Sequence, residues 1–168
     1  MEECVIEYSD LCIDSLVRQL SQIFIQGAIS QNKERCERRD NYLKNVKCVE
    51  KIFQPLRGCM KNFILDLELV SIIDIDLLIP TICCSFGKYQ KCSLDAIDAS
   101  CNPNEAEYFT SSINGYSSDL VAAICLEYEP GSSRCQEVKV PKTNTTSSAY
   151  LSIFPSLNRA LNRLGNEE

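Results

Sequence analysis

Hydrophobic residues recur at helical spacing along most of the chain, which predicts an all-α fold. Between Asp10 and Ile29, apolar side chains recur every three or four residues with polar side chains between them. This pattern predicts an amphipathic helix that ends near Gly27. Residues 33–54 predict a second, highly charged helix with a thin apolar face, and Pro55 and Gly58 would interrupt the chain after it.

Residues 59–79 form the most apolar stretch and fit two patterns. Apolar and acidic residues alternate over 65–69 and 73–77 as in a strand, whereas the apolar positions of 63–70 fit one face of a helix. Because no strand partner is evident elsewhere, we favour a helix with a break near 71–74. The strand remains the alternative.

The later elements are shorter and are separated by turn residues. Asn102, Pro103 and Glu105 form a helix start, with an Asn cap, proline in the first turn and glutamate at the third position. Asn114 and Gly115 then predict a turn. Helices are expected over residues 81–91 (after Pro80 at the first helical position), 93–100, 103–113, 119–128 and, after an extended polar stretch, 150–164.

Eleven cysteines in 168 residues change this picture from a plain helical protein to a cross-linked one. They are Cys4, Cys12, Cys36, Cys48, Cys59, Cys83, Cys84, Cys92, Cys101, Cys125 and Cys135. None has the C-x-x-C spacing of zinc ribbons, iron–sulfur proteins or thioredoxins. Their spread predicts disulfides between separate elements and therefore an oxidising compartment.

The absence of histidine narrows the chemistry further. It excludes Ser-His-Asp and Cys-His nucleophilic sites, HExxH zinc proteases and haem held by histidine. No histidine is present to activate a thiolate, so we assign the cysteines a structural role. We expect no enzymatic activity, no catalytic residue, no cofactor and no metal site.

An odd number of cysteines leaves the pairing open. About five disulfides would use ten of them, and the eleventh would be a free thiol or would link two copies as a homodimer. Cys83 and Cys84 are adjacent and point in different directions, so we expect them to join two different elements.

Two features bear on the compartment. The first residues, Met1 to Cys4, are acidic and lack the apolar region of a signal peptide. Because the cysteine pattern nevertheless indicates an oxidising compartment, we expect the mature form of a secreted, extracellular protein, with a cytosolic cysteine-rich protein as the alternative. Asn144 begins an Asn-Thr-Thr glycosylation sequon in a polar stretch, which favours secretion and predicts a glycoprotein.

Together these features predict a disulfide-stapled multi-helix bundle with an extended C-terminal tail. Residues 1–135 would form the disulfide-rich helical domain. Residues 136–168 would form a polar tail that ends in a short amphipathic helix.

Charge is distributed unevenly. The net charge is −6, which disfavours nucleic-acid binding, yet residues 33–61 carry nine basic and four acidic groups. This basic segment predicts binding of an extracellular protein or a polyanion, and the alternative is a solvated surface that pairs with the acidic rest of the molecule or of a second copy. On one continuous helix, three of its lysines would share a face. The candidate partner-binding residues are Arg38, Arg39, Lys44, Lys47 and Lys51.

The apolar run from Phe63 to Ile82 supports an alternative function. It could line a cavity for a small hydrophobic ligand such as a lipid, in which case the protein would be an extracellular carrier, or it could form an ordinary core. Its four acidic groups exclude a transmembrane segment. Those acids, at positions 66, 68, 74 and 76, lack the glycine-containing loop of a calcium site.

The order of the later cysteines resembles that of secreted arthropod cysteine-rich helical proteins of the haemolymph-glycoprotein type. The similarity rests on spacing and covers residues 36–135. It involves Cys59-Met60-Lys61, Cys83-Cys84, Cys92, Cys101, Ser118-Asp119-Leu120, Cys125 and Cys135. It implies a secreted helical protein and brings no catalytic motif.

Overall fold

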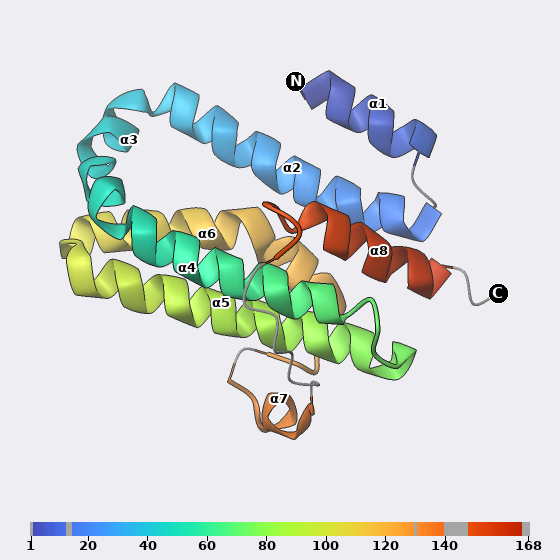
Figure 1. Cartoon of the computed structure of the whole chain (residues 1–168). Helices are drawn as coiled ribbons and strands as arrows, with labels where there is room; N and C mark the ends of the chain where they lie inside the picture. The colour runs from blue at the N-terminus through green and yellow to red at the C-terminus, as the bar shows by residue number, and fades with distance from the viewer. Residues whose placement is uncertain (1, 13–14, 130, 140–147, 166–168) are drawn as a thin grey trace.

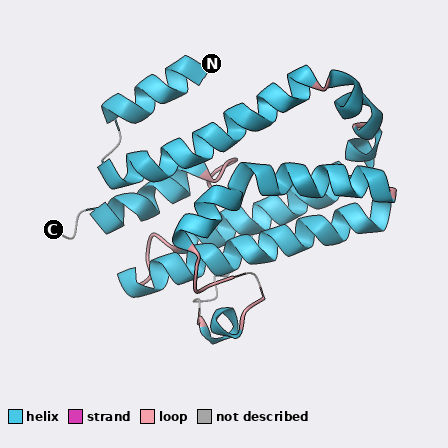
Figure 2. Ribbon diagram, turned by 180° about the vertical axis from the view of Figure 1, so that it is seen from behind, coloured by secondary structure: helices cyan, strands magenta, loops and turns pink. Residues whose placement is uncertain are grey.

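The computed structural model describes residues 2–12, 15–129, 131–139 and 148–165, and all regular structure in these ranges is helical (Figures 1 and 2). The predicted all-α class is confirmed. The elements are α1 (Glu2–Cys12), α2 (Ser15–Glu37), α3 (Arg39–Asn45), α4 (Lys47–Leu69), the 3₁₀ turn η1 (Ile75–Leu77), α5 (Leu78–Ser100), α6 (Pro103–Ile124), α7 (Ser133–Glu137) and α8 (Phe154–Gly165).

Helices α4, α5 and α6 form the centre of the bundle (Figure 1). Helix α4 packs along α5, and α5 packs on α6. Helix α2 lies over α6, with α1 on its outer side, and α8 packs against both α2 and α4. The short helix α3 connects α2 to α4 at one end of the bundle, while α7 stands away from the other helices on the far side of α5.

The main cluster of buried hydrophobic residues lies where α4, α5 and α8 meet. The apolar run that fitted both helix and strand supplies most of it, since the run forms the end of α4, a turn, η1 and the start of α5. The predicted helix and the predicted break near 71–74 are therefore both confirmed. The buried members are Phe63, Leu67, Val70, Ile73, Leu78, Ile82 and Ala160.

A tyrosine lies beside this cluster. The Tyr89 ring stacks on the Phe63 ring, with 5.3 Å between the centroids and 19° between the planes. Burial raises the pKa of the Tyr89 phenol. The ring therefore stays neutral in the core and contributes as an aromatic packing group.

Helix α4 continues through Pro55 and Gly58, so the predicted interruption is wrong. Pro55 removes the hydrogen bond to the carbonyl of Lys51, but both residues are exposed and water can satisfy that carbonyl. Buried side chains anchor the helix on both sides of the proline, among them Ile52 and Cys59. Tertiary packing thus outweighs the local cost of the proline.

Helix α6 continues through Asn114 and Gly115, where a turn was predicted. The glycine serves helix packing here: a Cβ on Gly27 of α2 would lie 3.1 Å from the Tyr116 carbonyl oxygen and 3.2 Å from that of Gly115. The two helices approach closely because neither glycine carries a side chain. Helix α2 likewise does not end near Gly27 but runs on to Glu37, and Gly27 is a contact position inside the helix rather than its end.

Helix α5 is also longer than predicted, since residues 81–91 and 93–100 belong to one helix. Pro80 is its third residue rather than its first, a position where the missing N–H still costs no intrahelical bond. The helix start at Asn102 is confirmed. The Asn102 side chain accepts a hydrogen bond from the Glu105 backbone at 3.0 Å, and the Glu105 carboxylate accepts one from the Asn102 backbone at 3.0 Å.

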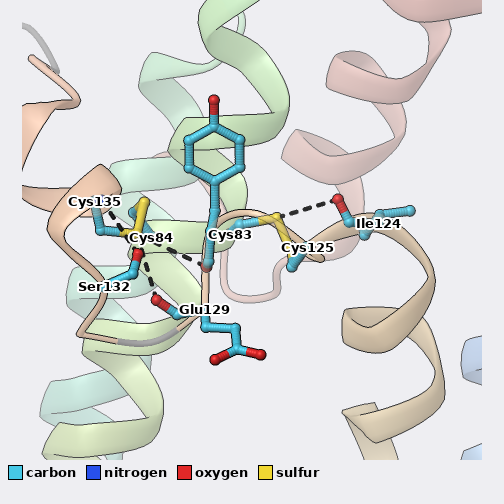
Figure 3. The surroundings of a disulfide bond; sticks show 8 residues. Cys83, Cys84, Ile124, Cys125, Glu129, Ser132 and Cys135 are labelled. Carbon is cyan, nitrogen blue, oxygen red and sulfur yellow. Dashed lines mark hydrogen bonds between the residues drawn. A yellow bond between two sulfur atoms is a disulfide. The ribbon is translucent and has the colours of Figure 1, made fainter.

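Four disulfides cross-link the described residues, and each has one cysteine on α5 or at its C-terminal cap. The pairs are Cys48–Cys101, Cys59–Cys92, Cys83–Cys125 and Cys84–Cys135. The two adjacent cysteines join different elements, as predicted: Cys83 bonds to the end of α6 and Cys84 to α7 (Figure 3). Helix α5 or its C-terminal cap thus takes part in every disulfide among the described residues.

Cys4 and Cys36 do not join disulfides, contrary to the expectation of five bridges. Both are exposed, Cys4 on α1 and Cys36 near the end of α2. The described disulfides leave these two helices without a covalent link to α5. The side chain of Cys12 lies outside the described part of the structure.

The C-terminal segment is held on the bundle by hydrogen bonds as well as by apolar contacts. The Arg163 guanidinium donates to the carbonyl oxygens of Val70 and Ile73, each at 2.7 Å. The Glu68 carboxylate accepts hydrogen bonds from the Ala149 backbone at 3.0 Å and from the Ser148 hydroxyl. The end of α4 and the following turn are thereby tied to α8 and the segment that precedes it.

Candidate functional site

An open cleft of about 580 Å³ lies at the α3 end of the bundle, between α3 and the start of α6. Its lining is polar and comes from the end of α2, from α3 and from the first turns of α6. The lining residues are Glu34, Arg38, Asn41, Lys44, Asn45, Asn102, Asn104, Glu105, Glu107, Tyr108 and Ser111.

Side-chain hydrogen bonds join lining residues on each side of the cleft. Asn45 is buried, and its side-chain amide donates to the Asn41 backbone carbonyl at 2.8 Å and to the Asn41 side-chain oxygen at 3.3 Å. On the opposite side, the mutual hydrogen bonds of Asn102 and Glu105 fix the start of α6. Each side of the cleft thus contains a local hydrogen bond between two lining residues.

The two walls of the cleft differ in charge. Arg38 and Lys44 lie on the α3 side, and Arg38 forms an ion pair with Glu34 at 3.3 Å. Glu105 and Glu107 lie on the α6 side. The cleft carries groups of both signs, so it is not by itself a strongly basic site.

The structure divides the five predicted partner-binding residues between two places. Arg38 and Lys44 line the cleft, whereas Lys47 and Lys51 lie on the exposed side of α4. Arg39 is exposed at the first turn of α3. The chain bends at Val46, between α3 and α4, so the prediction that Lys44, Lys47 and Lys51 share one face of a single helix is wrong.

Within the described ranges, the basic surface is not neutralised by the acidic part of the molecule. Arg38 pairs with Glu34, four residues earlier in the same segment. The other described ion pairs are Lys33–Glu37, Lys91–Asp95 and Arg134–Glu127, and none involves the remaining four candidates, Arg39, Lys44, Lys47 and Lys51. Their positive charge is available to a partner.

Two further cations of the basic segment lie on α4 but were not among the predicted residues. Arg57 and Lys61 are exposed and form no ion pair within the described part of the chain. Their position within residues 33–61 was a usable signal. By contrast, the polar residues of the α6 wall could not be predicted, because they reach the cleft only through the packing of α3 near α6.

A group of potential metal ligands borders the cleft. The side chains of Cys48, Cys101 and Glu105 lie together, with ligand atoms within 4.8 Å of one another. The two sulfur atoms are joined in a disulfide, so neither supplies the thiolate that a metal would need. These three residues are therefore a disulfide and a glutamate that belongs to the N-terminal cap of α6.

Two other features were predicted from the sequence, an apolar run that could bind a ligand and a glycosylation site. The apolar run from Phe63 to Ile82 contributes its buried side chains to the core, where they pack against one another and against α8. Asn144, the predicted glycosylation site, lies outside the described residues. None of the described helices is long and apolar enough to cross a membrane.

The fold and its cross-links define a disulfide-linked, all-helical protein. No protein-family model, curated protein or solved structure matches the chain. The resemblance to cysteine-rich haemolymph proteins therefore stays a prediction from cysteine spacing.

Proposed function

We propose that the chain is a secreted, non-enzymatic protein that binds an extracellular protein or polyanionic partner through the basic surface formed by Arg38, Arg39, Lys44, Lys47 and Lys51. Disulfides persist in oxidising compartments, which supports an extracellular location. Arg38 and Lys44 at the cleft and Lys47 and Lys51 on α4 form two groups, and both lie near the α3 end of the bundle (Figure 1).

One observation carries this proposal: four of the five cations are exposed and form no ion pair within the described residues. A surface that served only to balance the acidic segment would show pairs between the two. The unpaired cations attract an acidic partner at short range, where the net negative charge of the rest of the molecule is screened by salt.

The alternative, a carrier of a small hydrophobic ligand, remains a prediction of the sequence. The buried side chains of its apolar run fill the core between α4, α5 and α8. We prefer the binding proposal because its five residues are exposed and can contact a partner, whereas these apolar side chains are buried in the core.

Charge reversal tests the proposal. The variant Lys44→Glu/Lys47→Glu/Lys51→Glu should bind polyglutamate and heparin at least about ten-fold more weakly than the parent in a titration at fixed salt, because contact charges determine this kind of binding. The matched control, Lys33→Glu/Lys88→Glu/Lys91→Glu, changes the net charge equally with exposed lysines of α2 and α5. It should lose less than about three-fold.

Equal losses in the two variants would show that only the net charge matters. Failure of the parent to bind either acidic probe would refute the proposal.

A further inference from the structure

The exposed side of α4 carries a row of cations longer than the predicted surface. Lys47, Lys51, Arg57 and Lys61 are all exposed, and Glu50 is the acidic residue among them. At 1.5 Å per residue, the row extends about 21 Å along the helix. The helix lies on the outside of the bundle over this length (Figure 1).

The cations of this row are free to contact a ligand. No described ion pair includes any of the four, and Glu50 does not pair with them either. Gly58 lies within the second half of the row, between Arg57 and Lys61, and a Cβ at that position would meet no atom within 4 Å. The helix surface is therefore open between these two cations.

The composition of the row favours a chain of repeated negative charges over a protein surface. The buried centres of protein interfaces are depleted in charged residues and rich in aromatic ones, whereas this row has three lysines and an arginine with Phe53, 55% exposed, as its exposed large apolar residue. Lysine ammonium groups on flexible stems bind successive anions as point charges. At 3.6 residues per turn, the pair Lys47 and Lys51 and the pair Arg57 and Lys61 are offset by about 80° around the helix, so the cations form an oblique band that an extended polyanion can follow.

We infer that the row Lys47–Lys51–Arg57–Lys61 is a binding site for a linear sulfated polysaccharide lying along α4. The inference rests on the proposed function and names its partner class. The disulfides direct the choice among polyanions, because they indicate an extracellular protein, for which sulfated glycans are accessible ligands. It also adds two residues, Arg57 and Lys61, that lie outside the surface proposed above.

Those two residues provide the test. Arg57→Gln/Lys61→Gln should bind heparin at least about five-fold more weakly than the parent, and its affinity should fall less steeply with salt, by about two released counterions. The control Lys88→Gln/Lys91→Gln removes two exposed lysines of α5 and should change the affinity less than about two-fold. For heparin fragments of increasing length, affinity should rise until the fragment spans the row and then level off.

Three probes separate the outcomes: heparin, polyglutamate and a short DNA duplex. Heparin binding that is insensitive to Arg57→Gln/Lys61→Gln, or DNA binding as tight as heparin binding, would overturn the inference. If polyglutamate still binds and depends on Lys44, Lys47 and Lys51, the proposed function stands without it. If none of the three probes binds, both the proposed function and the inference of a polysaccharide site fail.

Discussion

At the scale of single residues, Arg163 has the clearest structural role. Its guanidinium donates two hydrogen bonds to backbone carbonyls at the end of α4 and in the turn that follows. Helix ends leave carbonyl groups without intrahelical partners, and a charged donor is a strong partner for them. One side chain of α8 therefore completes the end of another helix.

Replacing Arg163 with methionine should lower the free energy of unfolding by about 1.5–3 kcal/mol, the usual contribution of hydrogen bonds to a charged group. Urea denaturation of the oxidised protein measures this. Arg57→Met is the matched control, since Arg57 is exposed and has no ion pair among the residues that the structure describes, and it should change stability by less than about 0.5 kcal/mol. Equal losses in both variants would contradict the proposed role of Arg163.

The sequence could predict some residues and not others, for physical reasons. The mutual hydrogen bonds of Asn102 and Glu105 were predictable because they depend on residues three apart. The role of Arg163 was not, because its partners lie about ninety residues away in sequence. The same limit applies to Tyr108 and Ser111, which line the cleft only because α3 and α6 lie close together.

At the scale of elements, glycine and proline had different roles from those that local patterns predict. Gly27 and Gly115 allow α2 and α6 to approach closely, and Pro55 lies on the exposed side of α4. In each case the packing of the whole helix outweighs the local preference of these residues for a turn. The helices predicted to end at Gly27, at Asn114 and at residue 91 were therefore correct in kind but too short, whereas the single helix predicted over 33–54 is divided among α2, α3 and α4.

Two glycine-to-alanine substitutions test this account of packing. Gly58→Ala should raise the free energy of unfolding by about 0.5–1 kcal/mol, because the added methyl group has open space and alanine favours the helix. Gly27→Ala should lower it, because the new Cβ presses on two backbone carbonyl oxygens of α6. Thermal melting of both variants gives the comparison. A gain for Gly27→Ala as large as that for Gly58→Ala would show that the close approach is unimportant.

At the scale of the whole molecule, the described cysteines divide into two groups. Eight form disulfides centred on α5, whereas Cys4 and Cys36 are exposed thiols on the two N-terminal helices. The cysteine count predicted a cross-linked helical protein but could not give the pairing, because pairing depends on which helices are neighbours. The homodimer expected from an unpaired cysteine stays a prediction.

The charge of the molecule is divided as well. The basic segment 33–61 runs from the end of α2 through α3 and along α4, and most of its cations form no ion pair among the described residues, whereas the acidic residues of 62–137 are spread from the end of α4 to α7. Surface charges separated in this way orient the approach of a charged partner. The sequence predicted the basic segment, and the structure adds its division between the cleft and the α4 row.

Disulfide mapping tests the central claim, a helical bundle cross-linked through α5 in an oxidising compartment. Protein purified without reductant is alkylated, digested and analysed by mass spectrometry. We expect the four linked peptide pairs Cys48–Cys101, Cys59–Cys92, Cys83–Cys125 and Cys84–Cys135, with Cys4 and Cys36 alkylated in the monomer. Alkylation of all eight α5-linked cysteines, or a different pairing among them, would contradict it.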